Sequence, residues 1–274
     1  MQVHNNTNSH SLSHLSGISN GVKITILGCG TSTGVPVIGC GCNICTSKDV
    51  KNKRTRSSLL ITASSKNILI DTSTDLRYQS LAYKIDRIDA VLYTHPHADH
   101  IHGIDELRTF NMIQKSAIPC YGSEFTINRI REMFRYIFIH DENDSWKPDL
   151  ETFLVSSSFD LFGLLIQPIN VYHGKMQILG FRIGGFAYIT DCSQIPDDSK
   201  KLLNNLDILI LGALRHKPHP THFSIQEAVH VGEELKAKRV ILTHLGHNLD
   251  YIETNKTLPN GFELAYDGME IEIS

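Results

Sequence analysis

The stretch Thr94-His95-Pro96-His97-Ala98-Asp99-His100 directly follows the apolar segment Ala90–Thr94, which predicts a buried strand. Four side chains that bind metals well, three histidines and one aspartate, therefore fall within six residues at the end of a strand. Histidine nitrogen together with carboxylate oxygen suits zinc, manganese or iron. A polar loop with coincidental histidines is the alternative, and the dense spacing after a buried strand argues against it. The motif therefore predicts a metal site.

Further ligand-type residues occupy the same position at the ends of three later predicted strands. His173 follows Leu164–Val171, Asp191 follows Phe186–Thr190, and His244 follows Arg239–Thr243. A single histidine at a strand end is readily explained as a core histidine. Three ligand types in the same position, after the first motif, are harder to explain in this way. We expect them to complete two metal sites with the first motif.

Short apolar segments alternate with amphipathic ones from Gly21 to the end of the chain, which predicts one α/β domain over residues 21–274. The predicted strands are Val22–Leu27, Ser58–Thr62, Asn67–Asp71, Ala90–Thr94, Leu164–Val171, Ile178–Ile183, Phe186–Thr190, Ile208–Leu211, Arg239–Thr243, Phe262–Tyr266 and Glu270–Ile273. The predicted helices are Thr74–Tyr83, Ile104–Lys115, Glu124–Ile137, Pro196–Asn204 and Ser224–Lys236. Ser123 is a predicted N-cap, and the spacing of Ser224 and Glu227 indicates a capping box.

The first twenty residues are rich in Asn, Ser and His and predict a disordered tail, so its three histidines are discounted as ligands. This segment lacks the positive start and apolar core of a secretory signal, which favours a cytoplasmic protein. No apolar run approaches the roughly 18 residues of a membrane span. The formal charge of -3 argues against a protein that coats nucleic acid. The 15 His and 6 Cys, beside a single Trp, are either coincidental or an indication of metal chemistry.

A second metal site is indicated by Cys40-Gly41-Cys42-Asn43-Ile44-Cys45, which places three thiols within six residues. A disulfide plus one odd thiol is the alternative, but without a secretion signal reduced thiols are expected. Tetrahedral zinc needs a fourth ligand, and His247, three residues after His244, is the best candidate. We therefore predict a structural zinc on these four residues. The remaining cysteines, Cys29, Cys120 and Cys192, are expected to be buried and inert.

The ordered set His95, His97, Asp99, His100, His173, Asp191 and His244 resembles the metallo-β-lactamase superfamily from Gly21 onward. The resemblance implies an αββα sandwich, in which two mixed β-sheets lie face to face between helices and two metals occupy a cleft at one sheet edge. It implies that His95, His97 and His173 hold one catalytic metal. Asp99, His100 and His244 would hold the second, and Asp191 would bridge both. His97 favours hydrolysis over oxygen reduction, because oxygen-reducing members carry an acid there.

The cysteine cluster, the turn Gly28–Gly34 and the sequence Thr243-His244-Leu245-Gly246-His247 resemble the PhnP-type branch, as do Gly103–Arg108 and Arg56-Ser57-Ser58. The resemblance implies a phosphodiesterase for small cyclic phosphates. A hydroxide shared by two divalent metals (Mn or Zn, or else Fe) would attack phosphorus. His222, 22 positions before His244, would protonate the leaving group, unless it is only a histidine at a helix start. Asp99 and Asp191 would act through the metals.

Rival functions share parts of this pattern. A tRNA 3′-processing endonuclease would carry the same ligands but usually a flexible basic arm, and a thioester or lactone hydrolase would share the metal core. A zinc-binding scaffold that has lost catalysis would normally lack a ligand. Arg56, Arg108 and Arg215 are candidates for phosphate contacts, and Ser123–Leu150 for a lid, a dimer surface or plain core packing. We expect a small phosphodiester substrate, no membrane or nucleic-acid partner, and leave a homodimer open.

Overall fold

The computed structural model describes residues 21–139 and 146–273, so the predicted tail, residues 1–20, lies outside the described residues. Within them, fourteen strands form two seven-stranded sheets. The first sheet has the order β14 (Met269–Ile273), β1 (Val22–Gly28), β2 (Ser58–Ala63), β3 (Lys66–Ile70), β4 (Ala90–Leu92), β5 (Ile118–Gly122) and β6 (Leu150–Leu154). The second has the order β13 (Phe262–Leu264), β12 (Arg239–Thr243), β11 (Ile208–Gly212), β10 (Phe186–Ile189), β9 (Met176–Ile183), β8 (Leu164–His173) and β7 (Phe159–Leu161).

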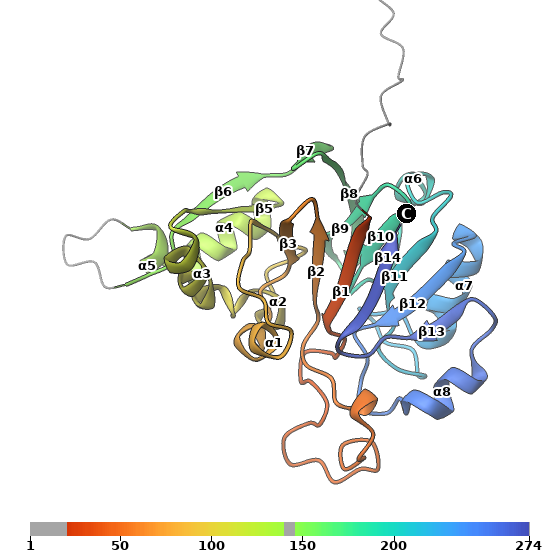
Figure 1. Cartoon of the computed structure of the whole chain (residues 1–274). Helices are drawn as coiled ribbons and strands as arrows, with labels where there is room; N and C mark the ends of the chain where they lie inside the picture. The colour runs from red at the N-terminus through yellow and green to blue at the C-terminus, as the bar shows by residue number, and fades with distance from the viewer. Residues whose placement is uncertain (1–20, 140–145, 274) are drawn as a thin grey trace, which may run out of the picture.

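Both sheets are mixed in the same way. From β14 to β3 and from β7 to β10 neighbouring strands are antiparallel, and from β3 to β6 and from β10 to β13 they are parallel. The sheets lie face to face with helices outside both (Figure 1). The first sheet is covered by α1 (Leu76–Ala82), α2 (Ala98–Ile101), α3 (Leu107–Gln114), α4 (Glu124–Met133) and α5 (Arg135–Phe138), and the second by α6 (Asp197–Lys201), α7 (Ile225–Leu235) and α8 (Tyr251–Thr257). The predicted αββα sandwich is confirmed.

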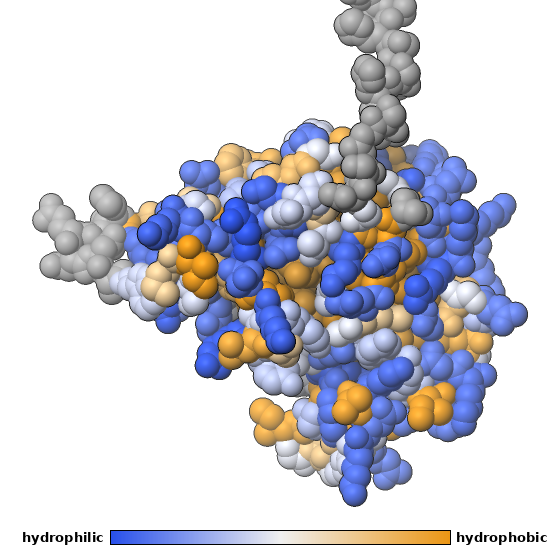
Figure 2. Space-filling view, in the orientation of Figure 1, coloured by the Kyte–Doolittle hydropathy of each residue, from blue (hydrophilic) through white to orange (hydrophobic). Residues whose placement is uncertain are grey.

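Side-chain alternation along the strands separates two hydrophobic cores. On β2, Leu59 and Ile61 point into the core between the sheets, whereas Leu60 packs under the helices on the outer face. Because successive side chains on a strand point to opposite faces, a strand covered on both sides is apolar throughout. This explains why the parallel strands appear in the sequence as continuous apolar runs. The face shown in Figure 2 is correspondingly dominated by hydrophilic residues, with apolar side chains showing in smaller areas between them.

Helix boundaries follow the caps where the sequence contains them. The Ser224 hydroxyl accepts from the Glu227 amide and the Glu227 carboxylate accepts from the Ser224 amide, so the predicted capping box of α7 is confirmed. Ser123 likewise caps α4. The single helix predicted over Glu124–Ile137 is wrong, because the backbone leaves the helical region at Phe134 and divides it into α4 and α5.

Several elements were not predicted from the sequence. They are β5, β6, β7, α2, α8 and the 3-10 turn Val50–Asn52, whereas the helix predicted over Ile104–Lys115 begins as a 3-10 turn, Ile104–Glu106, and continues as α3. Most are short, and β6 alternates exposed and half-buried residues at a sheet edge, so its apolar signal is weak. Across the two described stretches of chain, none of the helices combines the length and hydrophobicity that crossing a bilayer requires.

Candidate metal centre

Strand ends bring the predicted ligands to one edge of the sandwich. The histidine motif follows β4 and continues into α2, while Asp191 and His244 follow the parallel strands β10 and β12. His173 is the last residue of β8. Strands that run parallel end at the same edge, so residues far apart in sequence meet there. All seven predicted ligands are present at this edge.

The ligand atoms form two clusters with a bridge between them. His95, His97 and His173 lie within 4.8 Å of one another in one cluster. Asp99, His100, Asp191 and His244 do so in the second cluster. Asp191 also faces the first cluster, with one carboxylate oxygen 3.8 Å from His95 Nε2. Its other oxygen lies 2.9 Å from His244 Nδ1, so this single carboxylate faces both clusters.

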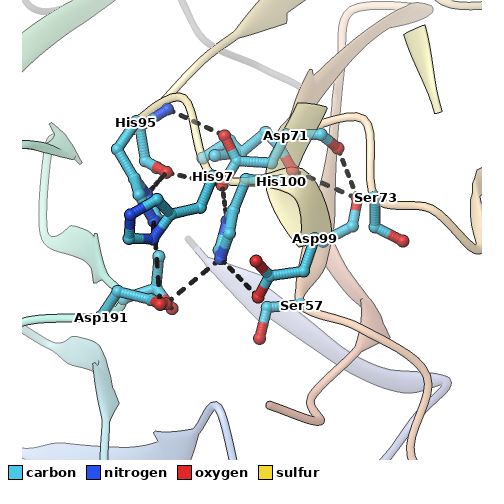
Figure 3. A network of polar contacts seen from close by, with 12 residues as sticks. Ser57, Asp71, Ser73, His95, His97, Asp99, His100 and Asp191 are labelled. Atoms are coloured by element: carbon cyan, nitrogen blue, oxygen red, sulfur yellow. Dashed lines mark hydrogen bonds and ion pairs between the residues drawn. The ribbon is translucent and has the colours of Figure 1, made fainter. Parts of the chain in front are cut away.

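The charges in the centre fit divalent cations. Asp99 Oδ2 and His100 Nε2 are buried without a hydrogen-bond partner, and His100 Nε2 is 3.3 Å from both Asp99 and Asp191 (Figure 3). Burial lowers the pKa of His95, keeping the imidazole in the neutral form that binds metal. Burial alone would also lower the pKa of His100, but Asp191, Asp99 and Asp71 raise it well above its usual range. The centre thus holds negative charge that a cation neutralises.

Asp71, which our sequence reasoning missed as a site residue, orients His100. It follows β3 and is fully buried, and its carboxylate lies 2.7 Å from His100 Nδ1 and accepts from the amide and hydroxyl of Thr94. Figure 3 shows the His100 ring between Asp71 on one side and Asp99 and Asp191 on the other. A carboxylate behind a histidine ligand fixes the ring and its tautomer. The strand-end position was visible in the sequence, since Asp71 ends a predicted strand.

We expect Asp71→Asn to weaken metal binding by roughly 10–100-fold, because the amide is uncharged and supports the His100 imidazole poorly. Metal retained after dialysis against graded chelator concentrations measures the change. Asp86→Asn is the matched control, since Asp86 is exposed. Equal metal retention in the Asp71 variant and the wild type would show that Asp71 has no part in holding the ligand.

Two other ligands are also held by neighbouring groups. His244 lies 3.2 Å from the hydroxyls of both Ser57 and Thr31, and the Nδ1 atom of His173 lies 2.7 Å from the Thr221 carbonyl oxygen. These contacts use the Gly28–Gly34 turn and the Arg56-Ser57-Ser58 stretch, which resemble the PhnP-type branch. Those stretches therefore position a ligand of the metal centre.

His222 lies in the loop before α7 and belongs to the same site. Its Nδ1 atom is 4.0 Å from Asp191, and its ring stacks on His244 at 5.0 Å between centroids. Burial lowers the pKa of His222 to about 3, although Asp191 acts in the opposite direction. Its imidazole is thus neutral at pH 7 in the free site. A proton on His222 needs an additional negative group nearby.

The four predicted zinc ligands also lie close together, although His247 is about 200 residues from the three cysteines in the sequence. His247 Nδ1 lies 3.4 Å from Cys40 Sγ and 3.6 Å from both Cys42 Sγ and Cys45 Sγ. Zinc–sulfur and zinc–nitrogen bonds at a tetrahedral angle give a sulfur–nitrogen separation of about 3.6 Å. These residues therefore fit a tetrahedral zinc ion. The cluster lies in the segment between β1 and β2, which projects at the lower edge of Figure 1.

The three candidate arginines for phosphate are already engaged within the chain. Arg56 forms a two-oxygen ion pair with Asp75, and Arg108 pairs with Asp105 at 3.0 Å. Arg215 donates to two carbonyl groups of its own loop. Each has a structural partner, which accounts for its presence without a substrate. The other three cysteines, Cys29, Cys120 and Cys192, are buried, as expected.

In the described residues of Ser123–Leu150, core packing explains only part of the segment, because Tyr136 and Trp146 are 49% and 60% exposed. Ile130 and Ile137 are buried under the outer face of the first sheet, whereas Met133 is 45% exposed. Residues 140–145 of the candidate lid lie outside the described residues.

Comparison with known proteins identifies the family. A family model described as the β-lactamase superfamily domain matches residues 66–245. A crystal structure of a diphosphatase from the PhnP family is 43% identical, with a TM-score of 0.87, and the match covers 93% of this chain and 98% of that chain. Human tRNase Z, short form, is 22% identical with a TM-score of 0.67 over 92% of this chain and 99% of that one, which shows a shared fold.

A curated relative adds a second line of evidence. A Porphyromonas gingivalis protein named octanoyltransferase is 36% identical over 263 residues, which is 92% of this chain. The chain spans about half the length of that relative, 52%, so the name describes a protein with a second part of similar size. The chain belongs to the β-lactamase superfamily and is similar to the PhnP-family diphosphatase over nearly its whole length.

Proposed function

We propose that the chain hydrolyses a phosphodiester bond in a small molecule, using two divalent cations. His95, His97 and His173 would hold one cation, Asp99, His100 and His244 the other, and Asp191 would bridge them. The observation that carries the proposal is the position of Asp191, whose two oxygens face the two ligand clusters. Manganese, zinc or iron suits this set of nitrogen and oxygen ligands.

Two cations in this centre supply Lewis acidity toward a phosphoryl group and an activated water at neutral pH. The chain contributes the geometry. Asp71 holds the His100 ring at 2.7 Å, and the hydroxyls of Ser57 and Thr31 hold His244. Because these groups are buried and already oriented, little reorganisation is needed as charge develops on the phosphoryl oxygens.

His222 has the position of a general acid for the leaving group. It is half-buried beside Asp191, on a loop in which His216 and Pro218 are exposed to solvent. The free site holds the imidazole neutral, and a bound phosphate anion favours its protonated form. The proton would pass from His222 to the departing alkoxide, a step worth roughly 10²–10⁴-fold.

The substrate class is narrowed by charge and by similarity. The formal charge of -3 gives little long-range attraction for tRNA. A small cyclic phosphodiester remains our first candidate. The diphosphatase that is 43% identical favours a second candidate, a phosphoanhydride in a small diphosphate, since that bond is also cleaved at phosphorus. The octanoyltransferase name covers a protein about twice as long and does not decide between them.

A substrate panel tests the proposal directly. Manganese- and zinc-loaded protein would be assayed with bis-p-nitrophenyl phosphate, cyclic sugar phosphates, a small diphosphate, S-lactoylglutathione and a tRNA precursor. We expect the cyclic phosphates or the diphosphate to give the highest kcat/KM. Faster turnover of the thioester, or processing of the tRNA alone, would contradict the proposal.

A structural zinc on the cysteine cluster is part of the same proposal. We expect Cys42→Ser to carry roughly one zinc fewer per chain than the wild type, because a hydroxyl replaces one of three thiolate ligands. Metal analysis of purified protein gives the count. Cys120→Ser is the matched control, since Cys120 is buried elsewhere in the first sheet. An unchanged zinc count in Cys42→Ser would remove this site from the proposal.

The remaining partners follow from these sites. We place the protein in the cytoplasm, where thiols stay reduced enough to hold zinc. Neither a membrane nor a nucleic acid is proposed as a partner, and a homodimer can be sought by light scattering.

A further inference from the structure

We propose that the cluster of Cys40, Cys42 and Cys45 is an oxidation site whose disulfide form releases zinc and lowers catalytic activity. This inference rests on the structural zinc of the proposed function. It goes beyond that function because it assigns the cluster a response to peroxide. The reasons are the accessibility of the sulfurs, their mutual distances and the connection of this cluster to His244.

The accessible thiols of the chain are gathered in this one loop. Cys40 and Cys42 are half-buried and Cys45 behind them is 4% exposed, whereas Cys29, Cys120 and Cys192 are at most 1% exposed. Susceptibility of a thiol to oxidation follows its exposure and its thiolate character. Zinc keeps its cysteine ligands as thiolates, so the cluster presents nucleophilic sulfur at the surface. Peroxide is therefore expected to react here before it reaches the buried thiols.

The sulfurs are close enough for a disulfide to follow. The ligand atoms of the four residues lie within 4.8 Å of one another, and Cys42 and Cys45 have the CxxC spacing of thiol pairs that form disulfides. The Cys42 thiolate attacks one peroxide oxygen, so the O–O bond breaks, hydroxide leaves and a sulfenic acid forms. The Cys45 thiolate then attacks that sulfur, and a second hydroxide leaves as the S–S bond forms. Two electrons pass from the sulfurs to peroxide, and solvent protons convert the hydroxides to water.

Loss of two thiolates also loosens the loop. The amides of Val37 and Cys45 both donate to sulfurs of the cluster, at 3.3 and 3.4 Å. With a disulfide in place, one thiolate and one imidazole remain for zinc, which is below the four ligands of a structural site. His247 then loses its contacts with the three sulfurs.

The freed segment is continuous with the catalytic centre. His247 is three residues after His244, and the fully buried Arg54 joins this segment to the zinc loop. The Arg54 guanidinium donates to the carbonyls of Gly246 and Leu249, and its backbone pairs with Val35 at the start of the loop. Arg54 thus contacts both the zinc loop and the segment that follows His244, so a rearrangement of the loop is transmitted to that segment. The expected result is a poorly positioned His244 and roughly tenfold lower activity.

The test uses protein with manganese in the catalytic centre, so that zinc reports on the cluster alone. Metal analysis first establishes the zinc content per chain. Hydrogen peroxide is then added, released zinc is followed with a chromogenic chelator, the disulfide is located by peptide mass mapping, and activity is measured on bis-p-nitrophenyl phosphate. Cys120→Ser is the matched control and should behave as the wild type. Dithiothreitol with added zinc should restore both zinc content and activity.

The outcomes separate this inference from the function it rests on. About one zinc released per chain, with a Cys42–Cys45 disulfide and a reversible fall in activity, supports it. If metal analysis finds no zinc before peroxide is added, the structural zinc does not exist, and it is the proposed function that fails. Zinc that stays bound while buried thiols or methionines oxidise overturns the oxidation site. Zinc that leaves while activity stays unchanged overturns the connection to His244.

Discussion

Asp191→Ala is expected to lose catalytic metal and activity together, with activity falling by at least about 10³-fold. Asp191 is 2% exposed, and its two oxygens face two separate ligand clusters. Burial alone would raise the pKa of its carboxyl, but His244 and His100 outweigh burial and hold the pKa well below the usual range. The carboxylate is therefore charged at neutral pH. Removing it leaves the two clusters without the group between them.

Metal analysis after dialysis and the initial rate on bis-p-nitrophenyl phosphate measure the two losses. The backbone of Asp191 is left-handed, with φ at 53°, a conformation that alanine adopts less readily than asparagine. Asp191→Asn is therefore a second variant that keeps the backbone and removes the charge. Asp86→Ala, at an exposed carboxylate, is the control. A variant of Asp191 that keeps both metals and full activity would rule out the bridging role.

Most of this site could be predicted from the sequence, because its ligands lie at or just after the ends of predicted strands. Apolar segments predicted β8, β10 and β12, and each is followed or ended by one ligand-type residue. Parallel strands put these ends at one sheet edge, so three separate strand predictions converged on a single location. The prediction of an αββα sandwich rested on the family resemblance, because hydrophobic alternation and apolar runs do not show how two sheets pack together.

The residues that the sequence did not reveal orient the metal ligands and do not contact the cations themselves. Asp71 ends a predicted strand as Asp191 does, but nothing in a linear pattern says that it faces His100 and not a cation. Asp71, Asp191 and His244 all have left-handed backbones, with φ between 53° and 63°. Non-glycine residues adopt this conformation at a cost, and such residues gather at functional sites. The conformation depends on the surrounding packing, so local sequence could not reveal it.

The missed strands and helices fail for a related reason. β7 has only three residues, and β6 pairs at a sheet edge, where three of its five residues are exposed. Such elements are held by hydrogen bonds to a neighbouring strand more than by their own hydrophobic pattern. α8 has an N-cap, because Asp250 accepts from the Glu253 amide, yet it buries only Thr254. Its amphipathic signal is correspondingly weak.

His222→Ala is the second variant with a large expected effect, and it separates chemistry from metal binding. His222 forms a further group of ligand atoms within 4.8 Å with His173 and Asp191, but the seven predicted ligands fill the two clusters without it, so we expect both catalytic metals to remain. Hydrolysis of a cyclic phosphate with an alkoxide leaving group should slow by roughly 10²–10⁴-fold. Bis-p-nitrophenyl phosphate should be affected much less, since p-nitrophenolate leaves without a proton. His230→Ala, an exposed histidine on α7, is the control.

The pH dependence of kcat/KM distinguishes a general acid at His222 from a residue with only a structural role. Burial, opposed by Asp191, places the pKa of His222 near 3 in the free enzyme, and kcat/KM reports the free enzyme. Above that pKa the protonated fraction falls tenfold with each pH unit. The ratio of kcat/KM between wild type and His222→Ala on the cyclic phosphate should therefore decrease by roughly tenfold per unit between pH 6 and pH 8. A ratio that stays constant over this range would indicate that His222 only supports the loop, because packing does not depend on the proton.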